Sequence, residues 1–413
     1  MFSIDHLWYL RSFNKRDITD FYMYKLQKFS DPVMVTDNHA LQQMVEVLLK
    51  ETFITMDTEF VREKTYWPEL CLVQLAGKGK VYLLDAVAPG IDLSLLLPLL
   101  TAQSVIKVFH AAQQDLEIFL HLFNILPTPV FDTQIAAMVA GFGNQIGYDS
   151  LVDSLLKVAI DKSHRFSDWA MRPLTTAQQN YAAADVTYLW DVYLILLEQL
   201  TKTNRTSWVA AEIKILSDPE FFAPSMDKIW KRLRPRTGNR RVLGCLYAII
   251  QWREQEAQRL NIPRQHLVRD ESLLAIAAAL PDSVKALSRI RGISQGFADS
   301  KEGGSLLSVI KTVKNTELDT LPLPVSDESN KRKPSEAIIS LLKVLLQAKC
   351  EAYQVAPKLV VDSKDIENLA LGRRDLPVLV GWRRDVFGQD AVDLCNGQLI
   401  LGVQDQKIEI IKR

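Results

Sequence analysis

The hydrophobic pattern changes character partway along this 413-residue chain. Between about Thr52 and Phe131, short runs of β-branched and aromatic residues predict strands. The predicted strands are Thr52–Met56, Leu70–Ala76, Val81–Leu84 and Val105–Phe109, with a fifth at Val130–Phe131. Gly77 and Gly79 lie between the second and third strands, where a tight hairpin is expected.

Helical periodicity follows each of the later strands. The predicted helices cover residues 111–123, 133–140, 150–158 and 176–200. Strands interleaved with helices predict an α/β domain with a mixed sheet. We place this domain at residues 33–207, after an N-terminal extension at residues 1–32 for which Met23 is an alternative start.

The strand pattern largely disappears after about Arg205. Residues 208–293 are typical of short helices interrupted by prolines, namely Pro219, Pro224, Pro235, Pro263 and Pro281. A looser stretch at 300–334 contains Gly303, Gly304 and the polar run at 326–330. We expect one helical domain at 208–293 and a second, divergent helical domain with a tail at 294–413.

The two helical segments are similar to each other at an offset of 93 residues. The matched pairs are Leu246 and Ile339, Ile262 and Val355, Val268 and Val361, Leu273 and Ile366, Ile276 and Leu369, and Ala277 and Ala370. Apolar matches alone are weak, because any two amphipathic helices share a period. The loop lengths match as well, so we interpret the segments as a repeat.

The overall composition excludes several classes of protein. With 48% hydrophobic and 24% charged residues, the chain is not disordered, collagen-like or a coiled coil. Its 49 basic and 49 acidic side chains give zero net charge. Residues 1–207, however, carry 17 basic and 23 acidic side chains, and residues 208–413 carry 32 and 26. Zero net charge therefore does not exclude a nucleic-acid partner.

The cysteines and the apolar runs bear on the compartment. Four widely separated cysteines form no CxxC pair, which argues against a zinc site or a disulfide framework and favours the reducing cytoplasm. No apolar run approaches the roughly 20 residues of a spanning helix, so we expect no membrane partner. The N-terminus lacks an uninterrupted apolar segment and is not typical of a signal peptide.

Two acidic residues mark the end of the first predicted strand. Asp57 and Glu59 are two residues apart, so their side chains share one face of the strand. Neighbouring carboxylates on an apolar strand repel each other unless a cation lies between them. The alternative is a polar strand end that meets solvent.

Three more residues complete a candidate site. Asp115 lies where the fourth strand gives way to a helix, although an acid there also complements the helix dipole. Tyr181 and Asp185 are four residues apart on one helical face, and the three alanines between them allow close packing. An ordinary amphipathic turn is the alternative for that pair.

Taken together, these residues resemble a known set of motifs. Asp-x-Glu, the later Asp and Tyr-x-x-x-Asp resemble the three exonuclease motifs of the DEDD superfamily, and the tyrosine marks its DEDDy subclass. The segments 60–75, 110–117, 131–134 and 168–174 are similar to ribonuclease D, and the helical repeats resemble its two HRDC domains. The resemblance implies a ribonuclease H-like exonuclease domain with a mixed sheet flanked by helices, followed by two small all-α HRDC domains.

The resemblance also implies a chemistry. It predicts a 3′→5′ exoribonuclease that releases 5′-mononucleotides from structured RNA, notably transfer RNA precursors, and acts as a monomer. Asp57, Glu59 and Asp185 would hold one divalent cation, while Asp57 and Asp115 would hold a second. Oxygen ligands favour Mg²⁺ or Mn²⁺. Tyr181 would orient the attacking water.

Other residues are candidates for binding the substrate. Phe60 could wedge against a terminal base or be a core residue, and His110 could contact the terminal nucleotide or be satisfied structurally. The acid-free segment Lys228–Arg241 carries seven basic side chains, which could follow RNA phosphates or form a solvated face. We select Lys231, Arg232, Arg234 and Arg236 from it. We expect structural roles for Asp85 and Asp132, and assign none to His121 and His164.

Two other functions stay open. One is a DNA exonuclease of the same superfamily, although no phosphate-binding loop of a polymerase partner or helicase is present. The other is a non-catalytic RNA-binding protein on the same fold. The intact acids and tyrosine argue against the second, because a protein without catalysis has no reason to keep unpaired carboxylates together.

Overall fold

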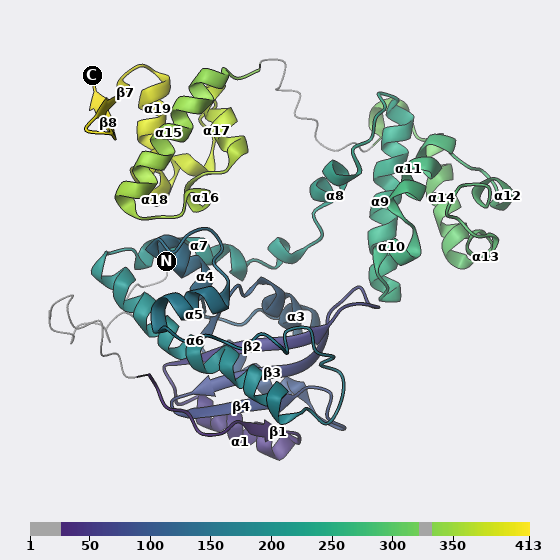
Figure 1. Ribbon diagram of the computed structural model, residues 1–413. Helices are drawn as coiled ribbons and strands as arrows, with labels where there is room; N and C mark the ends of the chain where they lie inside the picture. The colour runs from purple at the N-terminus through teal and green to yellow at the C-terminus, as the bar shows by residue number, and fades with distance from the viewer. Residues whose placement is uncertain (1–25, 322–332) are drawn as a thin grey trace.

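A computed structural model of the chain describes residues 26–321 and 333–413. Most of the expected N-terminal extension, the alternative start at Met23 and the polar run at 326–330 lie outside the described residues. Figure 1 shows an α/β body followed along the chain by two helical bodies. Within the described part, no helix combines the length and the apolar character needed to cross a bilayer.

The α/β body is built on a mixed sheet of six strands in the order β1-β4-β3-β2-β5-β6. The strands are β1 (Val33–Val35), β2 (Phe53–Val61), β3 (Glu69–Gly77), β4 (Lys80–Asp85), β5 (Ile106–Phe109) and β6 (Val130–Asp132). β2, β3 and β4 are antiparallel neighbours, whereas β1, β5 and β6 join in parallel. Gly79 has a φ of +74° in the turn between β3 and β4, which confirms the predicted hairpin.

The structure corrects two details of the predicted strands. β1 was not predicted, because three residues are too few to show an alternating pattern. β2 continues five residues beyond Met56, so Asp57 and Glu59 lie inside the strand and not at its end. The strand is extended because β3 pairs with it as far as Val61, with a shift of register between Glu59 and Phe60.

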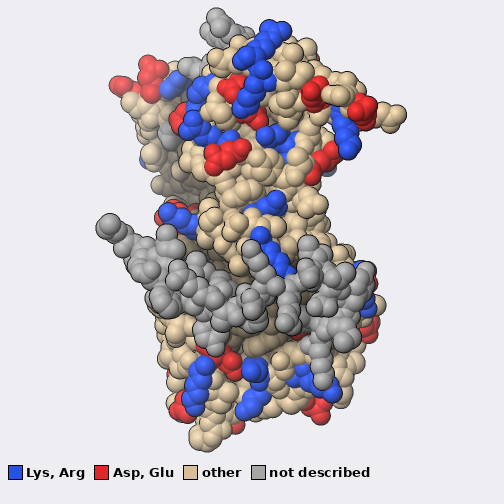
Figure 2. Space-filling model, turned by 90° about the vertical axis from the view of Figure 1, so that its left-hand side faces the viewer, with Lys and Arg blue, Asp and Glu red and all other residues tan. Residues whose placement is uncertain are grey.

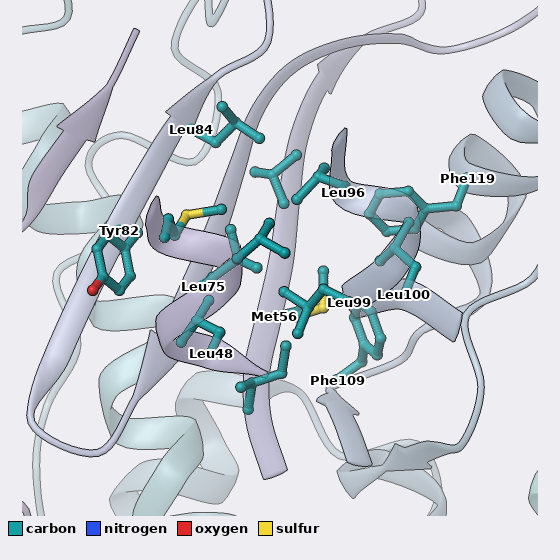
Figure 3. Close-up of a cluster of buried hydrophobic side chains, with 14 of the residues drawn as sticks. Leu48, Met56, Leu75, Tyr82, Leu84, Leu96, Leu99, Leu100, Phe109 and Phe119 are labelled. Atoms are coloured by element: carbon teal, nitrogen blue, oxygen red, sulfur yellow. The ribbon is translucent and has the colours of Figure 1, made fainter. Parts of the chain in front are cut away.

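Helices cover both faces of the sheet. One face packs against α1 (Asn38–Leu48), the turn η3 (Leu93–Leu96), α2 (Leu97–Thr101) and α3 (Gln113–Phe123). The side chains of Met56, Leu75 and Phe109 point into this layer and are fully buried (Figure 3). The other face carries α6 (Thr176–Lys202), beside which α4 (Thr133–Ala140) and α5 (Tyr148–Leu156) pack.

The helix α6 brings the predicted tyrosine and aspartate over the sheet. Thr175 caps its first turn together with Gln178, whose side chain accepts from the Thr175 backbone N–H. Ala182 and Ala183 are buried against the sheet, as the small side chains predicted. The Thr55 hydroxyl of β2 donates to the Val186 carbonyl at 2.7 Å, which fixes the helix on the strand.

The helix that spans the predicted boundary at residue 207 belongs to the α/β body. α7 (Thr206–Ile213) buries Val209 and Ile213 in the same cluster as residues of α4 and α6. The predicted boundary between 207 and 208 is therefore wrong. The pattern of a surface helix shows which face is apolar, but not which body covers it.

The first helical unit comprises residues 226–321. Its helices are α8 (Met226–Leu233), α9 (Arg240–Leu260), α10 (Arg264–Leu267), α11 (Asp270–Ala279), α12 (Val284–Leu287), α13 (Gln295–Ala298) and α14 (Lys301–Asn315). Helices begin or end beside each predicted proline break. One buried cluster spans Ile229 to Leu321.

Helix α14 corrects both the expected boundary at 293 and the expected loose stretch. Leu306 and Ile310 of α14 are fully buried in the core of the first helical unit. A Cβ at Gly303 would lie 2.3 Å from the Phe297 carbonyl oxygen. The glycine therefore permits two helices to approach closely, and its presence does not indicate a flexible linker.

The second helical unit comprises residues 333–413. Its elements are α15 (Glu336–Tyr353), α16 (Pro357–Val360), α17 (Ser363–Ala370), α18 (Gly381–Arg383), the π-turn η8 (Arg384–Gly388), α19 (Gln389–Cys395), β7 (Leu399–Gln404) and β8 (Lys407–Lys412). The β7–β8 hairpin was expected only as a tail. Its turn residues Asp405 and Gln406 both have positive φ, without the glycine that usually marks such a turn.

The internal repeat is visible in the backbone. α16 lies 93 residues after α10, with the same length. The long helices before them both end in a left-handed residue, Asn261 (φ 50°) and Gln354 (φ 49°). The 93-residue offset is confirmed through α11 and α17, after which the two units take different structures.

The first helical unit contacts the loop between β2 and β3. The Asn261 side-chain oxygen accepts hydrogen bonds from the backbone N–H groups of Tyr66 and Trp67, at 3.1 and 3.0 Å. The Tyr66 hydroxyl donates to Glu254 at 3.0 Å and accepts from Gln258 at 3.1 Å. This contact is mostly polar.

The second helical unit contacts α4 and α7. Gly141, at the end of α4, lies so close to Gln354 that a Cβ there would be 2.5 Å from the Gln354 carbonyl oxygen. The Arg205 guanidinium donates to that same oxygen at 3.3 Å. The rings of Trp208 and Trp382 stack at 4.7 Å, with an arginine over the Trp208 face and another over the Trp382 face. This contact combines stacked aromatic rings with close backbone packing and hydrogen bonds.

Candidate active site

Three of the predicted carboxylates meet between β2 and α6. Asp57 and Glu59 point from the α6 side of β2, because residues two apart share a strand face. Asp185 reaches them from α6, one helical turn after Tyr181. One carboxylate oxygen from each of the three acids lies within 4.8 Å of the others. The arrangement is an all-oxygen donor set, which suits a hard divalent cation.

The fourth acid lies beside this group and not in it. Asp115 is buried in the first turn of α3, and its Oδ1 accepts a hydrogen bond from the Thr58 hydroxyl at 2.5 Å. Its charge contributes to the raised pKa of Asp57, so the two carboxylates are electrostatic neighbours. The described residues therefore present a compact triad with a flanking acid.

The pKa values of the four acids are raised, which indicates that no positive side chain compensates their negative charge. Burial, reinforced by the charges of Asp185 and Asp115, raises the pKa of Glu59 to about 9. Burial likewise raises the pKa values of Asp115 and Asp185 to about 7, and that of Asp57 well above its usual range. Desolvated carboxylates that lie this close together retain protons unless a cation offsets their charge. Their grouping fits a metal site.

Tyr181 lies at the edge of the carboxylate group. Burial, followed by the charges of Asp185 and Glu59, raises its pKa above the ordinary value. The phenol is therefore neutral at physiological pH and can donate a hydrogen bond, but it is not a base. The Trp169 ring packs against it, with ring centroids 6.0 Å apart.

The two candidate nucleotide contacts differ in their surroundings. Phe60 is half-buried and packs against the core cluster on the α1 and α3 side of the sheet. His110 has both ring nitrogens engaged, with the Thr133 hydroxyl at 3.0 Å and the Ile146 carbonyl at 3.1 Å. These contacts support a structural role for His110, because they leave neither ring nitrogen for a nucleotide.

The basic segment divides into structural and exposed members. Arg240 and Arg241 donate to backbone carbonyls around residues 313–319, inside the first helical unit. Arg232 forms an ion pair with Asp270 at 3.3 Å. The exposed side chains that form no ion pair within the described residues include Lys231, Arg234 and Arg236.

The charge asymmetry is not uniform over the basic half. In the view of Figure 2, basic and acidic side chains alternate over the upper part of the molecule, where the second helical unit lies. On the face seen in this view, the mixed charges do not form a continuous path for phosphates. The end of α8 and the segment that follows it carry the exposed basic side chains selected as candidates for holding RNA.

Asp85 and Asp132 have the structural roles expected of them. Asp132 caps α4 by accepting from the backbone N–H groups of Gln134 and Ile135. Asp85 ends β4 and forms a bidentate ion pair with Arg172. The sequence placed both acids at strand ends, and the structure shows the hydrogen-bond and ion-pair partners of each.

Sequence reasoning missed two residues next to the site. The half-buried Tyr148 donates its hydroxyl to the Ala184 carbonyl at 2.9 Å, and its pKa is raised by desolvation and by the charges of Asp185 and Asp57. Gln74 is fully buried and lies opposite Asp57 on β3, with neither side-chain polar atom hydrogen-bonded. Only the pairing register could have identified Gln74, because its own strand reads as continuously apolar.

Known proteins resemble the chain over most of its length. Residues 32–201 match a family described as 3′-5′ exonuclease, and residues 242–310 match the HRDC domain. These matches do not confirm a second HRDC domain. Ribonuclease D of Gluconacetobacter diazotrophicus is 55% identical over 384 residues, which cover 93% of this chain and 98% of that protein. Ribonuclease D of Granulibacter bethesdensis is 52% identical over 386 residues, with 93% and 98% coverage.

A solved structure extends this similarity to three dimensions. The crystal structure of Escherichia coli RNase D, described as an exoribonuclease involved in structured RNA processing, aligns with a TM-score of 0.75 at 28% identity. The alignment covers 89% of this chain and 99% of that one. A catalytic core of RRP6 from Trypanosoma brucei shares the fold at 22% identity, with a TM-score of 0.55 over 72% of this chain and 85% of the other.

Proposed function

The chain belongs to the ribonuclease D family and is a 3′→5′ exoribonuclease of structured RNA, and we propose that it trims the 3′ ends of transfer RNA precursors to 5′-mononucleotides. The carboxylate triad of Asp57, Glu59 and Asp185 is the observation that carries this proposal. Phosphodiester hydrolysis develops negative charge on the attacking and leaving oxygens. A site that gathers cations between clustered, half-buried acids suits that charge.

We propose that two divalent cations, Mg²⁺ or Mn²⁺, are the cofactors. Asp57, Glu59 and Asp185 would hold one of them, and Asp57 with Asp115 would hold the other. When bound, the pair supplies Lewis acidity at the scissile phosphate. The raised pKa values of these acids support the assignment, because they indicate that the pocket lacks a compensating positive charge.

The chain's own side chains would orient the reactants. Tyr181 keeps its proton and donates a hydrogen bond that aligns the attacking water. Phe60 follows Glu59 on the opposite face of β2 and is only half-buried, and its exposed part would contact the terminal base. Lys231, Arg232, Arg234 and Arg236 would hold the phosphates of the RNA body, which lies away from the cut.

We further propose a monomer that acts in the cytoplasm. The four cysteines are free thiols in the structure, and three of them are buried. Free thiols suit a reducing compartment.

The test is a trimming assay on a 5′-labelled transfer RNA precursor with a 3′ extension. With Mg²⁺, we expect a ladder that shortens one nucleotide at a time, together with 5′-mononucleotide product. Asp57→Asn and Asp185→Asn should reduce turnover by at least about 1,000-fold, since each removes a negative charge that holds the cations. They should leave RNA binding nearly as in the parent chain. Release of oligonucleotides would contradict the exonuclease assignment, and a greater preference for single-stranded DNA would favour the DNA alternative.

A second test uses pH without RNA. The folded chain without metal retains protons on Asp115 and Asp185 to about pH 7 and on Glu59 to about pH 9, whereas the unfolded chain loses them near pH 4. The folded state thus binds more protons, so its stability should fall as pH rises from about 5 to 9. Saturating Mg²⁺ should flatten this slope in thermal melts. An equal slope with and without Mg²⁺ would contradict cation binding by these acids.

A further inference from the structure

Arg172 lies beside the active site, between two structural elements that carry proposed catalytic residues; each is called a wall of the site below. One wall is the β2–β3 pair, from which Glu59 projects, and the other is α6 with Tyr181. We infer that Arg172 is a positioning residue that sets the place of Tyr181 for the exonuclease reaction. The inference rests on the catalytic role proposed for Tyr181.

A carboxylate fixes the orientation of the guanidinium. Asp85, buried at the end of β4, accepts from the Arg172 Nε at 2.8 Å and from its Nη2 at 2.7 Å. A bidentate pair of this kind restricts the plane of the guanidinium as well as its position. The remaining N–H groups are therefore aimed in defined directions.

The first of these directions leads to the wall of Glu59. Nη2 of Arg172 also donates to the Cys71 carbonyl at 2.8 Å. Cys71 is the extra residue of the β-bulge, because Glu59 pairs with Leu72 and the next residue of β2 pairs with Leu70. The Arg172 hydrogen bond therefore anchors the guanidinium to the irregular point of the sheet, at the register shift next to Glu59.

The second direction leads to the wall of Tyr181. Nη1 of Arg172 donates to the carbonyls of Trp169 at 2.6 Å and Met171 at 2.9 Å. These bonds fix the backbone of Trp169, whose side chain is buried and packs against the Tyr181 ring. The phenol therefore rests on an indole whose backbone is tied to the sheet by Arg172. Lysine has a single point charge and cannot reproduce five such bonds.

The experiment is a double-mutant cycle on a short single-stranded RNA with Mg²⁺. Arg172→Lys and Tyr181→Phe are made alone and together, and kcat and KM are measured separately. We expect Arg172→Lys to lower kcat by about 10- to 100-fold, the range for a misplaced catalytic group, with KM little changed. In the Tyr181→Phe background, the same change should lower kcat less than threefold.

A matched control separates positioning from stability. Asp390→Asn removes a comparably buried ion pair, Asp390 with Lys349 at 2.6 Å, in the second helical unit. It should lower the melting temperature about as much as Arg172→Lys without changing kcat. If Arg172→Lys is poorly folded, Asp85→Asn serves in its place, since it keeps the shape of the pair and removes the charged acceptor.

The outcomes distinguish the inference from its premise. A loss in kcat that is additive with Tyr181→Phe, or a kcat equal to that of the control, would overturn the positioning role while leaving the proposed function intact. Full turnover by Tyr181→Phe alone would overturn the role of Tyr181, and the inference with it. A loss that disappears in the Tyr181→Phe background supports both.

Discussion

The two helical units contact the α/β body through the same turn but with different chemistry. Each presents the left-handed residue that ends its long helix, Asn261 in the first and Gln354 in the second. Asn261 uses its side chain to bind two backbone N–H groups, whereas Gln354 presents its backbone carbonyl to Arg205 and packs on Gly141. A repeat preserves local backbone geometry, and the side chain at each copy decides what the turn binds.

The difference has a consequence for function. The first unit holds the loop that directly continues the strand of Asp57 and Glu59. The second unit holds α4 and α7, which supply none of the proposed catalytic side chains. Loosening the first contact should therefore disturb RNA cleavage, whereas loosening the second should mainly cost stability.

The largest expected effect is from removing the aromatic contact of the second unit. Trp382→Ala deletes a buried indole that stacks on Trp208 and donates to Glu212 at 2.9 Å. We expect a loss of about 4 kcal/mol in local stability, measured as faster hydrogen exchange in α15–α17. Trp230→Ala, within the first unit, is the control and should speed exchange in α8 and α9 instead. If either variant speeded hydrogen exchange equally in both helical units, the two units would not be independent of each other.

A smaller effect is expected from crowding the Gly141 contact. Gly141→Ala places a Cβ 2.5 Å from a backbone oxygen and strains a residue with a φ of +93°, so we expect a loss of about 3 kcal/mol. Gly143→Ala strains a similar φ of +96° with no atom within 4 Å of the new Cβ, and should cost about 1 kcal/mol. Chemical denaturation measures both. Equal losses would mean that the second unit yields to the clash.

The most direct comparison replaces the two turn residues themselves. Asn261→Ala leaves two N–H groups of the β2–β3 loop without their acceptor and should cost about 2 kcal/mol. Gln354→Ala has the same backbone strain but keeps its docking carbonyl, and should cost less than about 1 kcal/mol. Turnover of structured RNA should fall only in Asn261→Ala. A reversed order would refute the proposed division between side-chain and backbone docking.

The smallest effect is expected in RNA affinity. Neutralising Lys231 and Arg236 together should weaken binding by about 1 kcal/mol and lower the slope of log affinity against log salt by about 2. Lys343→Ala with Lys407→Ala, two exposed positions of the second unit, is the matched control and should change neither. Filter binding at several salt concentrations measures the slopes. Equal slopes for the two pairs would place the phosphate path elsewhere.

Local pattern was sufficient for much of the fold. Five of the six sheet strands, the long helices of the α/β body and the 93-residue repeat follow from periodicity, glycine and proline. The failures share a cause. α7 and α14 were assigned to the wrong bodies because amphipathicity does not reveal the partner, and β1 and the β7–β8 hairpin carry too few residues or no glycine signal.

The sequence by itself determined which acids and which tyrosine this protein presents, because residue type and short spacing on a strand or helix are local properties. Tertiary structure alone decided that three carboxylates converge while Asp115 flanks them, and that His110 has both ring nitrogens engaged. It also placed Arg172 between the two walls of the site. Apart from the short bond from Arg172 to Trp169, these arrangements join residues from 23 to more than 100 positions apart, and packing of that range leaves no periodic signal in the chain.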